Sequence, residues 1–337
     1  MTRNQRGAMP KHTASPMPRS TSVSTGDQAI LNATRSIVTH ALASGLDGKL
    51  PTNTWFFERY GIVAGTMQRA LRVLKESDAL ETRSKGHMGR VITHIDTGLC
   101  WNIAKLPAVQ LLMPSSGSIE IDVLVEHVTG KLGAMNIPYF ISNATGGERR
   151  IAQVLKGDFD IALTSMGAAR NMVETIPDAC LRTMPPETYY SSRRLIVVSR
   201  SGEARDDWKT IAIDRNSSDH NDITEAEFPS SEGYSHVETD FRQVPSRILR
   251  REVDAGLWHL TSSPVPLELA GLRASMLQRE TAVEIHRNLS AAAFVVNPER
   301  PELVSLLAEL DDTLVMQAQL TAFHQEDPYL KAFETIG

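Results

Sequence analysis

The sequence of 337 residues lacks most features that mark a membrane, disulfide-rich or metal-binding protein. Its 2 cysteines, Cys100 and Cys180, are too few for a disulfide framework or a zinc site and predict reduced, buried thiols. No apolar run approaches the length of about 20 residues that a membrane-spanning helix needs. Residues 1–24 are polar and basic, without the apolar stretch of a secretory signal, and predict a disordered tail. We therefore expect a cytoplasmic protein with no membrane partner.

Motifs of common enzyme chemistry are also absent. The chain has no H-E-x-x-H, no P-loop, no G-x-S-x-G elbow and no C-x-x-C, and its histidines lack metal-ligand spacing. Gly146-Gly147 alone is too short a glycine signal to indicate phosphate binding, and is better read as a helix start. We therefore expect no enzyme activity, no cofactor and no metal, although a catalytic site assembled from distant residues remains an alternative.

The charge is divided unevenly along the chain. The composition, 41% hydrophobic and 22% charged, is that of an ordinary globular protein, and the length predicts two or three cores. Residues 1–97 carry 13 basic and 7 acidic residues, whereas residues 98–337 carry 22 and 33. This asymmetry is expected when a small basic module meets a polyanion and the acidic body does not. Chance variation in surface charge is the alternative.

The pattern of residues 25–97 predicts a small helical module. An amphipathic helix starts at residue 25, and Thr52 is a suitable cap for a second helix over 53–60 that Gly61 ends. A third helix follows after a short turn, so the second and third form a helix-turn-helix candidate. Residues 80–83 and 90–94 read as two strands of a hairpin with a basic tip.

The outer face of the third helix carries groups suited to DNA. Arg69 and Arg72 can bond guanine bidentately, Gln68 can bond adenine, and Thr66 can hold a phosphate. Gly65 has no Cβ and would allow close backbone approach. The DNA-binding candidates are Thr52, Gly65, Thr66, Gln68, Arg69, Arg72, Lys85, His87 and Arg90.

Residues 48–92 resemble the winged helix-turn-helix of GntR-type transcription regulators along their whole length. The positions that carry the resemblance are Leu50-Pro51, Gly61, Gly65-Thr66, Arg69-Ala70-Leu71, Leu74 and residues 86–89. The chain departs from that pattern at Val63 and Ala64, which leaves more of the readout to the other candidates. The resemblance implies a double-stranded DNA operator as partner; a helix-turn-helix that does not bind DNA is the alternative.

Beyond residue 109 the pattern changes to alternating strands and helices. Strands over 109–113, 137–142 and 159–164 with helices over 119–131 and 147–156 predict a parallel sheet covered on both faces. A second set follows, with strands over 194–199, 210–214, 236–241 and 257–261 and helices over 219–228 and 246–255. A strand over 291–296 and a helix over 299–314 return to the first set. We expect two lobes, one from 98–195 with 290–337 and the other from 196–289.

This two-lobed order, joined to the N-terminal module, resembles the YhfZ-type regulators, whose effector domain is similar to type 2 periplasmic binding proteins. The resemblance extends over nearly all of the chain beyond residue 25 and is strongest over 48–92 and 111–165. It implies a multidomain protein of the α and α/β classes, with a winged helix-turn-helix before a two-lobed type 2 periplasmic-binding-protein-like domain. It also implies a small-molecule effector without naming it.

Ligands of open α/β sheets bind at the carboxyl ends of the strands, so polar residues there are the ligand-binding candidates. They are Ser115, Ser116, Ser118, Thr164, Ser165, Arg193, Asp214, Arg215, Ser217 and Ser262. Hydroxyls beside a helix start suit a carboxylate or phosphate. The alternative is that they are only caps and turns, and that the arginines are solvated surface groups.

Together these patterns predict a DNA-binding transcription regulator that acts as a homodimer, since helix-turn-helix proteins usually read paired half-sites. A small, anionic metabolite bound between the lobes would modulate operator binding. The alternative is a solute-binding protein or enzyme of the type 2 binding-protein fold that carries a helical extension without DNA-binding activity.

Overall fold

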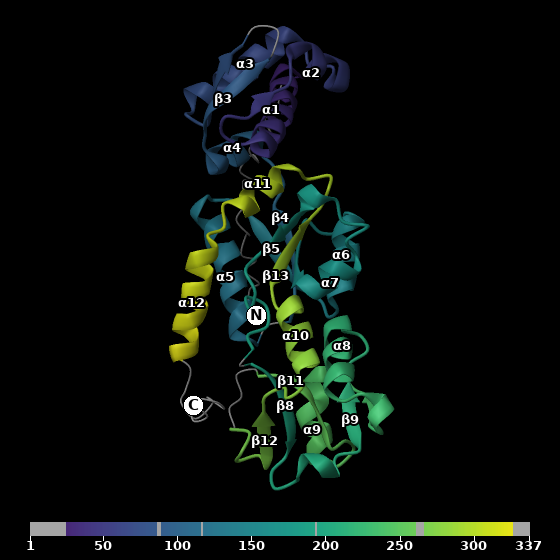
Figure 1. Cartoon of the computed structure of the whole chain (residues 1–337). Helices are drawn as coiled ribbons and strands as arrows, with labels where there is room; N and C mark the ends of the chain where they lie inside the picture. The colour runs from purple at the N-terminus through teal and green to yellow at the C-terminus, as the bar shows by residue number, and fades with distance from the viewer. Residues whose placement is uncertain (1–24, 86–88, 116, 193, 261–265, 326–337) are drawn as a thin grey trace, which may run out of the picture.

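The structure is a computed structural model that describes residues 25–85, 89–115, 117–192, 194–260 and 266–325. Its three parts follow one another along the molecule: an N-terminal module, a first lobe and a second lobe (Figure 1). The predicted tail, residues 1–24, lies outside the described residues.

The N-terminal module, residues 25–95, combines three helices with a small antiparallel sheet of order β1-β3-β2. Its elements are α1 (Thr25–Ser44), β1 (Lys49–Leu50), α2 (Asn53–Tyr60), α3 (Ala64–Glu76), β2 (Leu80–Ser84) and β3 (Arg90–Ile95). The predicted limits of α2 are confirmed. Thr52 Oγ1 accepts the Trp55 N–H at 3.2 Å, and Gly61 ends the helix in the left-handed region, at φ 66°.

The first lobe contains a five-stranded sheet of order β5-β4-β6-β13-β7. Helix α4 (Thr97–Ala104) links it to the module. Its other elements are β4 (Val109–Met113), α5 (Ile119–Ala134), β5 (Tyr139–Asn143), α6 (Gly147–Leu155), β6 (Ile161–Ser165), α7 (Met166–Asn171), β7 (Leu181–Thr183), β13 (Ala292–Val296), α11 (Glu302–Ala308) and α12 (Asp312–Gln325).

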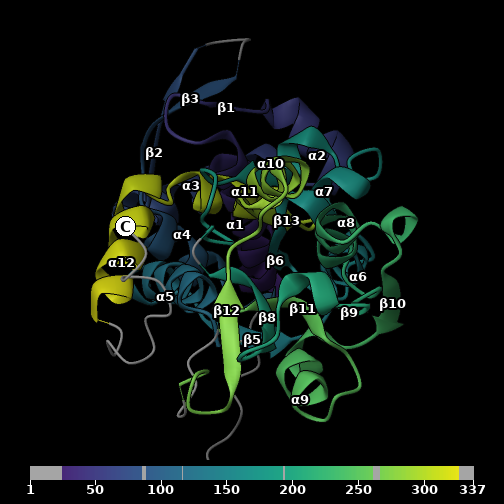
Figure 2. The ribbon, with the colours of Figure 1, turned by 60° about the horizontal axis from the view of Figure 1, so that its bottom comes forward.

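The second lobe repeats this plan in a sheet of order β10-β9-β11-β8-β12, whose strands lie side by side in Figure 2. Its elements are β8 (Leu195–Arg200), β9 (Thr210–Ile213), α8 (Ser218–Glu227), β10 (Ser235–Glu238), α9 (Val244–Leu249), β11 (Ala255–His259), β12 (Leu272–Ser275) and α10 (Glu280–Leu289).

The three strands from which a parallel sheet was predicted, β4, β5 and β6, are parallel as expected, but each complete sheet is mixed. Strands β4, β5 and β6 are parallel, as are β9, β10 and β11, but β13 and β8 run antiparallel to their neighbours. The reason is the crossing of the chain between lobes. A strand that arrives from the other lobe starts at the interlobe end, where the parallel strands finish.

Two predicted helices also have different limits. The helix expected over 246–255 ends at Leu249, and Arg251 then adopts a positive φ of 61°. The helix expected over 299–314 is divided into α11 and α12 by residues 309–311. Local apolar spacing continued through both breaks, and only the backbone geometry reveals them.

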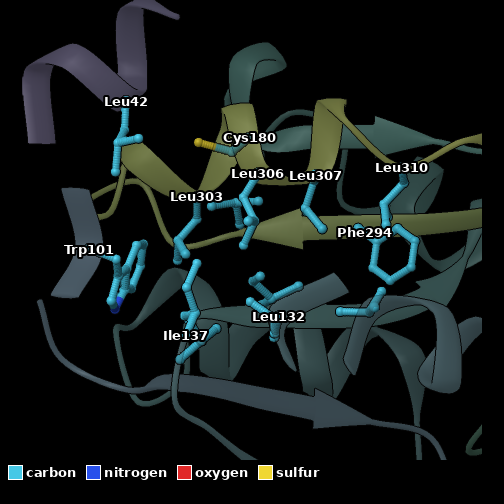
Figure 3. Close-up of a cluster of buried hydrophobic side chains, with 14 of the residues drawn as sticks. Leu42, Trp101, Leu132, Ile137, Cys180, Phe294, Leu303, Leu306, Leu307 and Leu310 are labelled. Carbon is cyan, nitrogen blue, oxygen red and sulfur yellow. The ribbon is translucent and has the colours of Figure 1, made fainter. Parts of the chain in front are cut away.

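The N-terminal module and the first lobe share one hydrophobic core. Leu42 of α1, Trp101 of α4 and Leu303 of α11 belong to a single buried cluster (Figure 3). Arg35 Nε donates to Ala104 O at 3.0 Å, and the Ser305 hydroxyl donates to the Leu42 carbonyl. The second lobe is built on two separate clusters. The module is therefore packed as one body with the first lobe.

Candidate functional site

A cavity of about 440 Å³ lies between the two lobes. Residues of the first lobe on its wall are Pro114, Ser115, Ser118, Ile121, Ala144, Thr145, Gly146, Gly147, Arg149, Arg150, Tyr189 and Tyr190. Those of the second lobe are Asp214, Asn216, Ser217, His220, Asp240, Phe241, Arg242 and His259. A volume in this range suits a metabolite-sized ligand.

Three helices begin at this cavity, because the strands before them end there. Ser118 caps α5 by accepting the Ile121 N–H at 3.4 Å, and Ser217 caps α8 by accepting the His220 N–H at 3.4 Å. Helix α6 begins after Gly146 without a side-chain cap. Helix starts carry partial positive charge and unpaired N–H groups, so the cavity wall is suited to an anion.

Arg150 is the buried cation of the first-lobe wall, with 3% of its surface exposed. Its Nε donates to Leu163 O at 2.8 Å, one terminal nitrogen donates to Ala144 O at 2.8 Å, and the other donates to the Tyr189 hydroxyl at 3.0 Å. All three acceptors are neutral. Among the described residues, no carboxylate forms an ion pair with Arg150.

The two acidic residues of the second-lobe wall are already bonded within that lobe. Asp214 accepts the backbone N–H of Asn216 at 2.9 Å and that of Phe241 at 3.1 Å. Asp240 forms an ion pair with Arg242, whose Nε lies 3.0 Å from Oδ1. Both carboxylates are therefore held in position by groups of their own lobe.

His220 contributes a neutral imidazole to the wall. Its ring stacks on Phe241, with centroids 5.1 Å apart, and meets the edge of Tyr190 at 6.1 Å. Burial lowers the pKa of His220 to about 4, although the nearby Asp214 carboxylate acts in the opposite direction. The imidazole is therefore uncharged at neutral pH.

A buried pair joins the lobes at the cavity, where His259 forms part of the wall. Glu120 Oε1 of α5 lies 3.3 Å from His259 Nε2 of β11 and accepts the Ser191 N–H at 2.9 Å. Burial by itself would raise the pKa of Glu120, but the His259 charge and these hydrogen bonds outweigh it, and the net direction is down. The carboxylate is therefore held in its charged form.

A second carboxyl group lies between the lobes at α7 and α8. Asp219 of α8 is buried, and its Oδ1 lies against Gly167 of α7. Burial raises the pKa of Asp219 to about 6, against the lowering effect of its hydrogen bond with Ser165. Asp219 is therefore partly protonated at mildly acidic pH.

The structure brings Ser115, Ser118, Asp214 and Ser217 together at the cavity. Thr164, Ser165 and Arg215 do not line it. Ser165 caps α7 by accepting the Ala168 N–H at 3.2 Å, Thr164 is fully buried beside Gly147, and Arg215 donates to Asn221 at 3.1 Å. Ser116, Arg193 and Ser262 lie outside the described residues.

Sequence reasoning missed several residues of the wall. Arg149 and Arg150 follow the second predicted strand, and the rule that polar residues at strand ends bind ligands applies to them as well. Tyr189 and Tyr190 come from an irregular segment, and His259 sits at the end of β11. These last three carry no local signal.

Most of the DNA-binding candidates are exposed. Gly65, Gln68, Arg69 and Arg72 lie on the open face of α3, opposite the buried Met67, Ala70 and Leu74, with Thr66 half-buried. Lys85 is exposed, whereas Arg90 is half-buried and donates to Thr82 Oγ1 at 2.7 Å. Thr52 is the cap of α2. His87 lies outside the described residues.

Two features of other protein classes are absent from the part of the chain that the structure describes. There, no three His, Cys, Asp or Glu side chains come close enough to hold a metal ion. Likewise, none of the described helices is long and apolar enough to cross a membrane.

Residues 96–328 match the family described as "YhfZ C-terminal domain". The chain belongs to this YhfZ family. A relative from Escherichia coli strain K12, named "Uncharacterized protein YhfZ", is 27% identical over 216 residues, which cover 63% of this chain and 68% of the relative. The N-terminal module lies outside the range that matches the family.

Two solved structures are similar to part of this YhfZ-family chain. A crystal structure of YhfZ from Shigella flexneri is 21% identical, covers 65% of this chain and 92% of its own, and has a TM-score of 0.49. The crystal structure of the periplasmic aliphatic sulphonate binding protein SsuA from Escherichia coli is 14% identical, with a TM-score of 0.46. The match covers 67% of this chain and 77% of SsuA.

Proposed function

We propose that the protein is a DNA-binding transcription regulator whose interlobe cleft binds a small, anionic metabolite that changes its affinity for an operator. The observation that carries the proposal is the exposed face of α3. Gln68, Arg69 and Arg72 point away from the module's core on successive turns of one helix. These are the side chains that pair with base edges in the major groove.

The remaining elements of the module support a winged helix-turn-helix. Helices α2 and α3 are separated by the short turn of residues 61–63, and strands β2 and β3 pair as an antiparallel hairpin beside them. Val63 provides no side-chain cap for α3, so the first N–H groups of that helix are left to a phosphate. Lys85, at the exposed end of β2, suits a backbone contact.

The joint between the module and the first lobe supplies a route from ligand to DNA. Because α1 packs on α11 through the shared core, a change in the angle between the lobes moves the second lobe relative to the module. In a homodimer, this movement would alter the spacing between the two copies of α3. We propose a cytoplasmic homodimer, and ligand recognition in place of catalysis as the role of the cleft.

The experiment is selection of bound sequences from a random-sequence duplex library, followed by affinity measurements at several salt concentrations. The parent protein should enrich a two-part motif, and log K should fall steeply with log salt. Gln68→Ala and Arg72→Ala should relax the base preference, whereas Lys85→Ala should weaken all sequences similarly. If no sequence motif is enriched in the selected library, the proposal of sequence-specific DNA binding is wrong.

The competing function is a solute-binding protein or enzyme with an extension that does not bind DNA. One observation favours it: the cavity wall is formed wholly by residues outside the module. Failure of DNA selection, together with turnover of a bound compound, would establish this second function.

A further inference from the structure

We propose that the ligand of the cleft is an organic oxyanion, a carboxylate or a phosphate monoester, whose head group is held at the start of α6 by Arg149, Arg150 and the first N–H groups of that helix. The inference rests on the proposed function of the cleft as a ligand site. It adds the chemical class of the ligand and its orientation.

The first support is the missing counter-charge of Arg150. A buried guanidinium is normally paired with a carboxylate, because an unpaired charge loses its hydration without compensation. Arg150 is 3% exposed, lines the cavity and uses one hydrogen bond per nitrogen on neutral acceptors. A guanidinium has five N–H donors, so two remain. An anion in the cavity would supply the missing partner.

The second support is the open start of α6. The Gly146 N-cap has no side chain to accept from the first turn. The acidic residue of that turn, Glu148, accepts from Asn171 Nδ2 at 2.9 Å and is not part of the cavity wall. The positive end of the helix is thus left to the cavity rather than to a carboxylate of the protein.

The packing at the start of α6 restricts its first residue, Gly147, to glycine. A Cβ on Gly147 would lie 2.6 Å from Thr164 Oγ1 and 2.5 Å from Ala168 Cβ, so only glycine fits. The Thr164 hydroxyl is fully buried and has no hydrogen-bond partner among the described residues. This hydroxyl lies against the first residue of α6 and outside the cavity wall, so it offers the helix start no acceptor from the cavity side.

The opposite wall accommodates the body of the ligand. The carboxylates of Asp214 and Asp240 are bonded within the second lobe. Between them and α6, the rings of Tyr190 and Phe241 line the cavity. An oxyanion seated on α6 would extend its organic part along these rings, toward the second lobe.

The test is a titration of the full-length chain, at constant ionic strength, with inorganic phosphate, small carboxylates and sugar phosphates, read by thermal shift and calorimetry. Neutral counterparts, namely the amides and the unphosphorylated sugars, serve as controls. We expect millimolar or tighter binding of at least one oxyanion and none of its neutral counterpart. The carboxylate and phosphate arms decide which head group is preferred.

Variants then locate the site. Arg149→Glu should weaken oxyanion binding by about tenfold or more, since it replaces a charged donor by a like charge. Arg170 is an exposed residue of α7 in the same lobe and lies outside the cavity wall. Arg170→Glu should therefore leave the affinity for the oxyanion within about twofold of the parent value. Arg150→Met should abolish binding; if it fails to fold, Arg149→Glu still decides.

Three results would overturn the inference: no oxyanion binds, neutral counterparts bind equally well, or Arg149→Glu and Arg170→Glu behave alike. DNA binding is measured separately on the same samples. A chain that binds oxyanions through Arg149 but never binds DNA would retain this inference and lose the regulator. A chain that binds DNA but no oxyanion would do the reverse.

Discussion

Glu120 and His259 come from different lobes and form a buried pair, with 3.3 Å between the carboxylate oxygen and the imidazole nitrogen. Glu120 is fully buried and His259 is 5% exposed. Because Glu120 belongs to the first lobe and His259 to the second, the distance between them depends on the relative position of the lobes. Opening the lobes separates the buried carboxylate from its imidazole partner in a place with little water.

We predict strong coupling within this pair. Glu120→Gln and His259→Gln should each destabilise the protein, by about 3 kcal/mol, because each leaves a buried partner unpaired. The double variant should cost less than the sum by about 1 kcal/mol or more. Denaturant unfolding of all four proteins measures the cycle.

The matched control is the exposed pair of Lys75 and Glu81. Lys75 Nζ lies 3.5 Å from Glu81 Oε1, and the two side chains are 68% and 44% exposed. Alanine variants there should give a coupling below about 1 kcal/mol. Additive effects at Glu120 and His259 would contradict the account of an interlobe pair.

His220 predicts a loss of stability as the pH falls. Its pKa is about 4 in the folded protein and 6.5 in the unfolded chain, so the unfolded state binds the extra proton between these values. The free energy of unfolding should fall over this range by roughly 3 kcal/mol from this group. Asp219 has the opposite effect. Its pKa is about 6 in the folded protein and 3.8 in the unfolded chain, so the folded state binds the extra proton and the stability from this group falls as the pH rises from 3.8 to 6.

The variant His220→Gln separates the two effects. Its stability relative to the parent should improve steadily as the pH is lowered from about 7 to about 5, since only the parent has an imidazole at this position that takes up a proton on unfolding. Denaturant unfolding at each pH measures the difference. A difference that does not change with pH would show that His220 is not held neutral by burial.

Gly167 predicts a steric link between α7 and α8. A Cβ there would lie 1.9 Å from Asp219 Oδ1 and 2.8 Å from Leu289 Cδ2, so Gly167→Ala forces these two buried or half-buried side chains to move. We expect a loss of about 1–3 kcal/mol in the free energy of unfolding. Adding Asp219→Ala should recover part of it.

Gly130→Ala is the control for Gly167. A Cβ at Gly130 of α5 meets no atom within 4 Å, so alanine there should be neutral or stabilise by up to about 1 kcal/mol. Equal effects of the two substitutions, measured by thermal and denaturant unfolding, would rule out the contact.

The shared core predicts that damage in the first lobe reaches the N-terminal module. Leu303→Ala should destabilise by about 2–5 kcal/mol and speed hydrogen exchange in α1, because Leu303 and Leu42 belong to one cluster. Leu257→Ala, in the separate core of the second lobe, should cost a similar amount without changing α1. Unchanged exchange in α1 with Leu303→Ala would mean that the module folds independently.

The part of the site that depends on local rules could be predicted from the sequence. Ser118 and Ser217 cap helices that begin where a strand ends, and both signals are contained within a few residues. The same rule placed Thr164 and Ser165 at a strand end correctly, but their side chains face α6 and α7 instead of the cavity. Which way a side chain points from the end of a strand depends on the elements packed around it, and these come from distant parts of the sequence.

The rest depends on how distant segments meet. The buried state of Arg150, the pairing of Glu120 with His259 and the stacking of His220 on Phe241 involve residues from both lobes or from separate elements. Likewise, β8 and β13 read as ordinary strands, and only their arrival from the other lobe makes the sheets mixed. No periodicity in one segment carries this information.

The central claim, that the exposed face of α3 reads DNA, is tested most directly by the affinity of Arg69→Ala/Arg72→Ala for the duplex selected by the parent. Fluorescence anisotropy at fixed salt gives the comparison. The account predicts at least about a tenfold loss for this variant. Arg273→Ala/Arg287→Ala, which removes the same charge from exposed positions of the second lobe, should bind nearly like the parent. Equal affinity of the α3 variant and the parent would contradict it.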